Sequence, residues 1–105
     1  MAYKYSTMMF HVRLTHSPEN CWGRDEHGGK AEELVTRIAD AEGSHGVSVH
    51  SAMVSPVEHT FYLLVESDTY ESLAGLLSGS IGQDHEANVV PVMTLRGAMK
   101  TLELE

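Results

Sequence analysis

The sequence predicts an α+β fold whose elements follow in the order strand, helix, strand, strand, helix, strand. Three observations predict it. Stretches rich in β-branched and aromatic residues alternate with two amphipathic segments, and Ser, Pro and Gly residues mark the turns between them. In addition, 105 residues suffice for one hydrophobic core and no more. We therefore expect a single domain over residues 1–105.

The first half of the chain begins with a strand and continues with a helix. Residues 8–15 read MMFHVRLT, are rich in β-formers and end before the Ser17-Pro18 turn. Residues 30–42 carry apolar side chains with the spacing of one helical face, and Gly43 follows as a terminating residue. This helical face consists of Ala31, Leu34, Val35, Ile38 and Ala41 or Glu42.

Two further strands, residues 46–54 and 59–66, are joined by the hairpin turn SPVE. If Val54 pairs with His59, both faces of this hairpin are largely apolar. One face then carries His50, Ala52, Val54, His59, Phe61, Leu63 and Val65, and the other carries Val47, Val49, Met53, Tyr62 and Leu64.

The second helix begins at the N-cap Asp68, with Glu71 three residues on, and ends near Gly79. Residues 89–95, VVPVMTL, form the last strand, and Pro91 favours an edge position because proline cannot donate to the ladder. This order of elements is typical of a ferredoxin-like βαββαβ domain, a four-stranded antiparallel sheet with two helices on one face. Since two helices cover only one apolar face, we expect a homodimer or an assembly of dimers.

Residues 8–95, including HTFYLLVES and VVPVMTL, resemble the dimeric α+β barrel superfamily, in which two ferredoxin-like subunits pack sheet against sheet. The HSPENC segment is similar to one in uncharacterised small proteins of this group. The superfamily includes small monooxygenases, muconolactone isomerase-like enzymes, haem-degrading enzymes, stress-induced proteins and small nickel-binding proteins. The resemblance therefore implies the fold far more narrowly than the function.

The composition of the chain argues against two kinds of partner, nucleic acid and membrane. Seven Lys and Arg residues against fifteen Asp and Glu residues give a formal net charge of -8, without a basic cluster to neutralise phosphates. We therefore expect no nucleic-acid partner. No apolar run approaches the roughly 20 residues of a membrane span, and the start MAYKYSTMMF lacks signal-peptide features. We expect a cytoplasmic protein without a membrane partner, and its one cysteine agrees with a reducing compartment.

The sequence also predicts a transition-metal site. His16 and Cys21 flank the exit of the first strand, and His50 and His59 lie on a mostly apolar strand face, where an imidazole needs a partner. Imidazole and thiolate suit nickel, copper, zinc and iron. We therefore expect His16, Cys21, His50 and His59 to be metal ligands, in sensing, storage or simple metal-assisted chemistry.

The placement of these residues depends on strand direction. If the first and third strands run parallel, the exit of the first strand lies far from His59 within one subunit. The same edge of the sheet then gathers His45, His50, Glu66, Asp84 and His85 near His16. We expect His27, His45 and His85 to serve mainly as solvent contacts.

Other functions stay open at this point. Backbone carbonyls or a tyrosine hydroxyl would also satisfy His50 and His59, and Cys21 is either a buried hydrophobe or a nucleophile with His16 as base. A monooxygenase- or isomerase-like enzyme would bind an aromatic or haem-like substrate between helices and sheet, with His50, His59 and Tyr62 orienting it. The chain would alternatively be an accessory subunit whose sheet face binds another protein.

Overall fold

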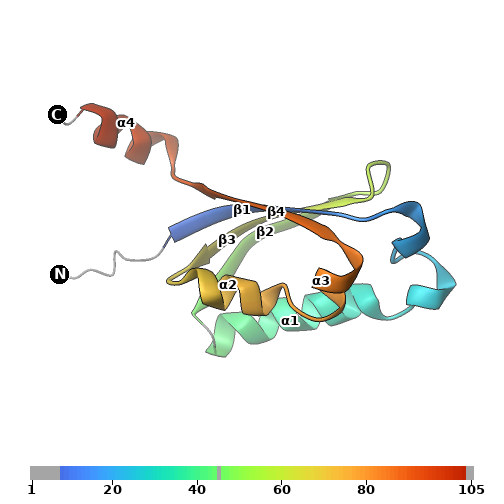
Figure 1. Cartoon of the computed structure of the whole chain (residues 1–105). Helices are drawn as coiled ribbons and strands as arrows, with labels where there is room; N and C mark the ends of the chain where they lie inside the picture. Colours follow the sequence, from blue (N-terminus) through green and yellow to red (C-terminus); the bar gives the residue numbers. More distant parts are fainter. Residues whose placement is uncertain (1–7, 45, 104–105) are drawn as a thin grey trace.

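The fold is a four-stranded antiparallel sheet with helices packed on one face, as Figure 1 shows for the computed structural model of the chain. The structure describes residues 8–44 and 46–103; His45 lies outside them. The strands are β1 Met8–Thr15, β2 Val47–Ser55, β3 Thr60–Ser67 and β4 Glu86–Val92. The helices are α1 Lys30–Ser44, α2 Tyr70–Leu76, α3 Ser80–Asp84 and α4 Leu95–Glu103, and the 3-10 turns are η2 Pro18–Asn20 and η3 Asp25–His27.

The strand order β2-β3-β1-β4 confirms the ferredoxin-like fold, with β4 at the edge that Pro91 predicts. The assumed direction of the third strand was wrong. β3 lies between β1 and β2 and runs antiparallel to both, so that Thr15, at the end of β1, pairs with Thr60, at the start of β3. The β1 exit therefore meets the β3 entry, where His59 lies, and not the β3 exit, where Glu66 lies.

The core lies between the sheet and the helices. Phe10, Val12 and Leu14 alternate along β1 and are buried against the helices, because successive side chains of a strand point to opposite faces. α1 contributes Leu34 and Ala41 to this core, whereas Val35 is 67% exposed. The buried stripe of α1 is therefore narrower than the sequence pattern predicts.

A β-bulge changes the expected assignment of the hairpin faces. Val54 pairs with Phe61, not His59, and the register shifts between Val49 and Ser51. The face that no helix of the described residues covers, called the open face, carries Met53, Tyr62 and Leu64 as predicted. Val47, by contrast, is buried in the core under the helices. The open face is consequently less apolar than the regular alternation predicts.

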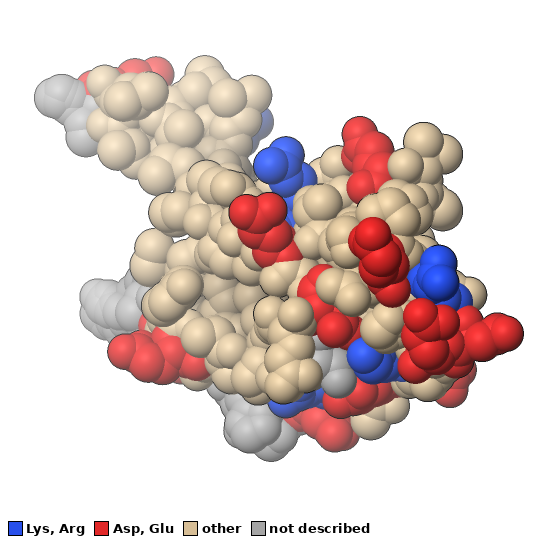
Figure 2. Space-filling view, turned by 45° about the vertical axis from the view of Figure 1, so that its right-hand side comes forward, with Lys and Arg blue, Asp and Glu red and all other residues tan. Residues whose placement is uncertain are grey.

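The C-terminal part departs most from the expectation. α2 begins after the N-cap Thr69, whose Oγ1 accepts a hydrogen bond from Ser72 N at 3.0 Å. β4 ends at Val92. Residues 93–103, called the arm, include α4 and project away from the body (Figure 1). Figure 2 shows that most of the arm's visible surface carries neither acidic nor basic side chains.

Within residues 8–44 and 46–103, no helix has the length and hydropathy to cross a membrane.

Candidate metal site

The candidate site lies at the end of the sheet where β1 exits and the β2–β3 hairpin turns. His16 follows β1 directly and is only 7% exposed. Its backbone N–H donates to the His59 carbonyl at 3.1 Å, which extends the β1–β3 pairing by one step. The two imidazole rings then lie with their centroids 5.3 Å apart. The expectation that His16 and His59 lie far apart in one subunit is therefore wrong, because β1 and β3 are antiparallel.

His59 has an unusual backbone. Its φ is 55°, in the left-handed region where a Cβ crowds the following carbonyl, and it is the one non-glycine residue of the described chain with a positive φ. Its N–H donates to the Pro56 carbonyl at 3.2 Å, which closes the turn. Glycine is common in this hairpin conformation. A histidine here instead directs an imidazole toward His16 from the first residue before β3.

Cys21 reaches the same place from the loop after β1. Cys21 directly follows the η2 turn, and its N–H donates to the Pro18 carbonyl at 3.2 Å. Its Sγ accepts a hydrogen bond from Gly23 N at 3.5 Å. One donor atom each of His16, Cys21 and His59 lies within 4.8 Å of the other two. The structure thus brings together three of the four residues expected as ligands.

A pocket of about 300 Å³ opens beside these three residues. Trp22, Phe61 and Val54 are among its apolar walls. Glu19, Asp25 and Glu26 belong to the η2 and η3 turns nearby, where Glu26 pairs with Arg24 at 3.3 Å. Figure 2 shows acidic side chains with basic ones among them on this side of the molecule.

His16 is buried, and its imidazole is held neutral. Burial, and then the neighbouring His85 and His59 rings, lower the pKa of His16 below its usual value. Neither its Nδ1 nor its Nε2 has a hydrogen-bond partner among the described residues. A buried polar atom of this kind needs an explanation, and a bound ion is one. A neutral imidazole with a free lone pair is the form that binds a metal.

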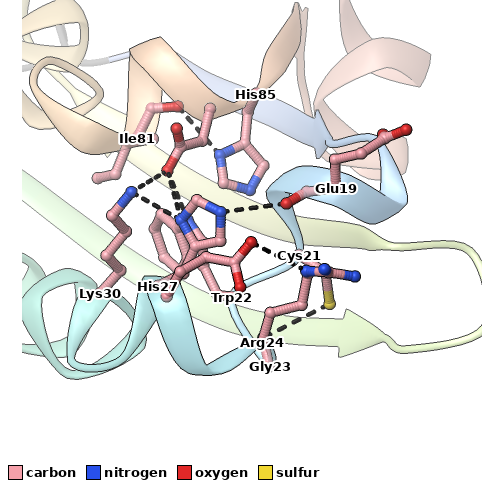
Figure 3. Close-up of polar contacts among 11 residues, drawn as sticks. Glu19, Cys21, Trp22, Gly23, Arg24, His27, Lys30, Ile81 and His85 are labelled. Atoms are coloured by element: carbon pink, nitrogen blue, oxygen red, sulfur yellow. Dashed lines mark hydrogen bonds and ion pairs between the residues drawn. The ribbon is translucent and has the colours of Figure 1, made fainter.

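A polar network fixes the loop that carries Cys21 (Figure 3). Trp22 Nε1 donates to Asp84 Oδ2 at 2.9 Å, and Lys30 Nζ donates to the same oxygen at 2.8 Å. The hydrogen bond from Lys30, followed by that from Trp22, lowers the pKa of Asp84. Lys30 also donates to His27 Nδ1 at 2.9 Å, and His27 Nε2 donates to the Glu19 carbonyl at 3.1 Å. His27 therefore has a structural role and is not mainly a solvent contact.

Two residues named from the sequence lie elsewhere. The His50 Nε2 is 2.8 Å from Glu66 Oε1, and β3 carries Glu66 toward its far end, away from Thr60. Tyr62 lies on the open face, where its hydroxyl donates to Glu58 Oε1 at 2.6 Å. Of His50, His59 and Tyr62, only His59 lines the pocket.

His85 and Trp22 pack beside the candidate ligands, which the sequence did not predict. The expectation that His85 lies at this edge of the sheet is confirmed, but its role as a solvent contact is not: its ring centroid is 4.8 Å from those of both His16 and Trp22. The position of His85 directly before β4 is the feature of the sequence that indicates its place near His16.

Comparison with known proteins shows the fold. The sequence matches no protein-family model and no curated protein. A conserved protein of unknown function from Bacteroides thetaiotaomicron, named a possible oxidoreductase, has a TM-score of 0.53 at 14% identity over 82% of this chain and 95% of that chain. Rv0793 from Mycobacterium tuberculosis has a TM-score of 0.55 at 13% identity, over 85% and 95% of the two chains. Both share the ferredoxin-like architecture with this chain.

Proposed function

We propose that this chain binds a transition-metal ion through His16, Cys21 and His59. The observation that carries the proposal is the convergence of two imidazoles and one thiol, with a donor atom of each within 4.8 Å of the others. The ring nitrogens of the buried His16, to which no described residue is hydrogen-bonded, support it, because an ion would satisfy one of them. Nitrogen and sulfur donors favour nickel, copper, zinc or iron over magnesium and calcium.

The spacing fits an ion after small adjustments. Donors at about 2.0–2.3 Å from a tetrahedral ion are roughly 3.3–3.8 Å from one another. Donor atoms within 4.8 Å would thus need to approach by about 1 Å, which side-chain rotation can supply. Two imidazoles on one such ion have ring centroids about 5 Å apart. The 5.3 Å between the His16 and His59 centroids is close to this value.

Calorimetric titration with nickel, zinc, copper and ferrous iron, under reducing and oxygen-free conditions, tests the proposal. We expect at least one ion to bind with a Kd below about 10 μM. His16→Ala, Cys21→Ser and His59→Ala should each weaken binding by at least about tenfold. His50→Ala is the matched control, since His50 pairs with Glu66 outside the site. Binding of none of the four ions, or equal binding by all variants, would contradict the proposal.

An oxidoreductase of the monooxygenase type is the second candidate function, and the comparisons favour it over storage or sensing. The Bacteroides protein that shares the fold is named a possible oxidoreductase. The pocket of about 300 Å³, with Trp22 and Phe61 in its walls, suits a small aromatic compound better than haem. In this function, His16 and His59 would hold or move a proton beside the bound ring.

The single tryptophan provides the assay for that second function. Trp22 lines the pocket, so a small phenol or quinol bound there should change its fluorescence. Phe61→Ala should weaken the response, whereas Val57→Ala, at a 90% exposed residue outside the pocket, should not. Oxygen consumption with the bound compounds would identify an oxidative reaction. Unchanged fluorescence with every compound would contradict this function.

The proposal includes a homodimer in which a second copy covers the open face and the arm. Leu95, Met99 and Leu102 lie at a helical spacing of four and three residues and are 77%, 54% and 84% exposed. The open face adds Met53, Val90 and Val92, which are also exposed. Apolar area of this kind favours a protein interface over open solvent.

A further inference from the structure

The hydrogen bonding of His85 determines which of its nitrogens is free. Its Nδ1 lies 3.0 Å from the Ile81 carbonyl oxygen. Since a carbonyl only accepts, Nδ1 carries the hydrogen and donates it. In the neutral ring, Nε2 then holds a lone pair and no hydrogen. This Nε2 is buried and has no hydrogen-bond partner among the described residues.

The surroundings hold the His85 ring beside the candidate metal site. The ring lies perpendicular to that of His16, with the centroids 4.8 Å apart, and perpendicular to Trp22 at the same distance. Phe61 packs on it with a centroid distance of 5.4 Å. Figure 3 shows the Nδ1 side of His85 bound to Ile81 and the opposite nitrogen directed away from it, on the side of the ring where Cys21 lies.

The same anchor positions His85 and Cys21. Asp84 precedes His85 in the chain, and its Oδ2 accepts the hydrogen bond from Trp22, the residue after Cys21. The loop after β1 and the start of β4 are thus tied together at one carboxylate. A shift of either segment toward an ion would carry the other with it.

We infer that His85 Nε2 supplies a fourth donor to the ion that His16, Cys21 and His59 bind. The inference rests on the proposed metal binding and completes a tetrahedral set of three imidazoles and one thiolate. Metal-binding histidines characteristically donate their other N–H to a carbonyl or carboxylate, as His85 does to Ile81. His85 lies outside the group of donors within 4.8 Å of one another, so its ring moves toward the ion on binding.

Nitrogen NMR of protein with isotope-labelled histidine, titrated with cadmium, tests the inference directly. Cadmium is a spectroscopic probe that takes the same nitrogen and sulfur donors. We expect the His85 Nε2 resonance to move and to couple to cadmium, together with one nitrogen each of His16 and His59. His50 is the internal control and should show no coupling.

Two variants extend the test to affinity and geometry. His85→Ala and His85→Gln should both weaken cobalt binding by at least about tenfold and reduce the intensity of the visible bands of the cobalt-loaded protein. Circular dichroism establishes that each variant is folded. Weaker binding without cadmium coupling at His85 in the wild type would make His85 a positioning residue for His16 and overturn the inference. Coupling at His16 and His59 alone overturns it while leaving the proposed function intact, and no coupling at any histidine overturns both.

Discussion

The left-handed backbone of His59 allows its effect on stability to be separated from its effect on metal binding. His59→Gly and His59→Ala both remove the imidazole, and they differ only in the Cβ at φ 55°. A Cβ in this conformation costs roughly 1–2 kcal/mol. Glycine avoids this cost but loses more backbone entropy on folding, which reduces its advantage over alanine by about 0.5–1 kcal/mol. The glycine variant should therefore be more stable than the alanine variant by about 1 kcal/mol.

Thermal and urea unfolding, with a chelator present and equal protein concentrations, measures this difference. For a domain of this size, about 1 kcal/mol corresponds to a Tm difference of about 4 °C. Glu58→Gly and Glu58→Ala form the control pair, because Glu58 has no positive φ, and here the glycine variant should be the less stable. Both His59 variants should lose metal affinity equally. An alanine variant as stable as the glycine variant would refute the reasoning about backbone strain.

Three more predictions follow from the site and the arm. Because burial lowers the pKa values of His16 and His85, the unfolded chain binds more protons than the folded one. The metal-free protein should thus lose stability as the pH falls below about 6.5, which urea unfolding at several pH values would detect. Asp84→Asn should lower the free energy of unfolding by about 1–2 kcal/mol, since Asp84 accepts from Trp22 and Lys30, whereas Glu26→Gln, in an exposed pair, should have little effect. The double variant Met99→Lys, Leu102→Lys should sediment as a folded monomer. A wild type that is monomeric at micromolar concentration would contradict the dimer.

The order of the elements was predictable because each leaves a strong local pattern. The apolar residues of β1 and β3 alternate or run together between turn residues, and the helical spacing of α1 is clear. The end of β4 was not predictable. The run VVPVMTL, apolar except for Thr94, continues through the point where the strand stops and α4 begins. Hydrophobicity alone cannot distinguish a strand from the apolar side of a short helix.

The candidate site was predictable only in part, because it depends on long-range pairing. His16 and Cys21 are close in sequence, and their shared location follows from the short turn between them. His59 joins them only because β3 runs antiparallel to β1. The orientation of His85 depends on its bond to Ile81 and on the packing of Trp22, neither of which leaves a pattern in the sequence.

The bulge in β2 bears on how freely this strand can change its length. Val49 pairs with Val65 and Ser51 with Leu64, so His50 is the extra residue of the bulge, opposite no residue of β3. A chain without it would keep the same partners on both sides of the gap, with Val47 still under the helices. The strand can thus lose one residue here without exchanging its two faces. At a regularly paired point of β2, a deletion or insertion that shifted the register by one residue would turn core side chains outward.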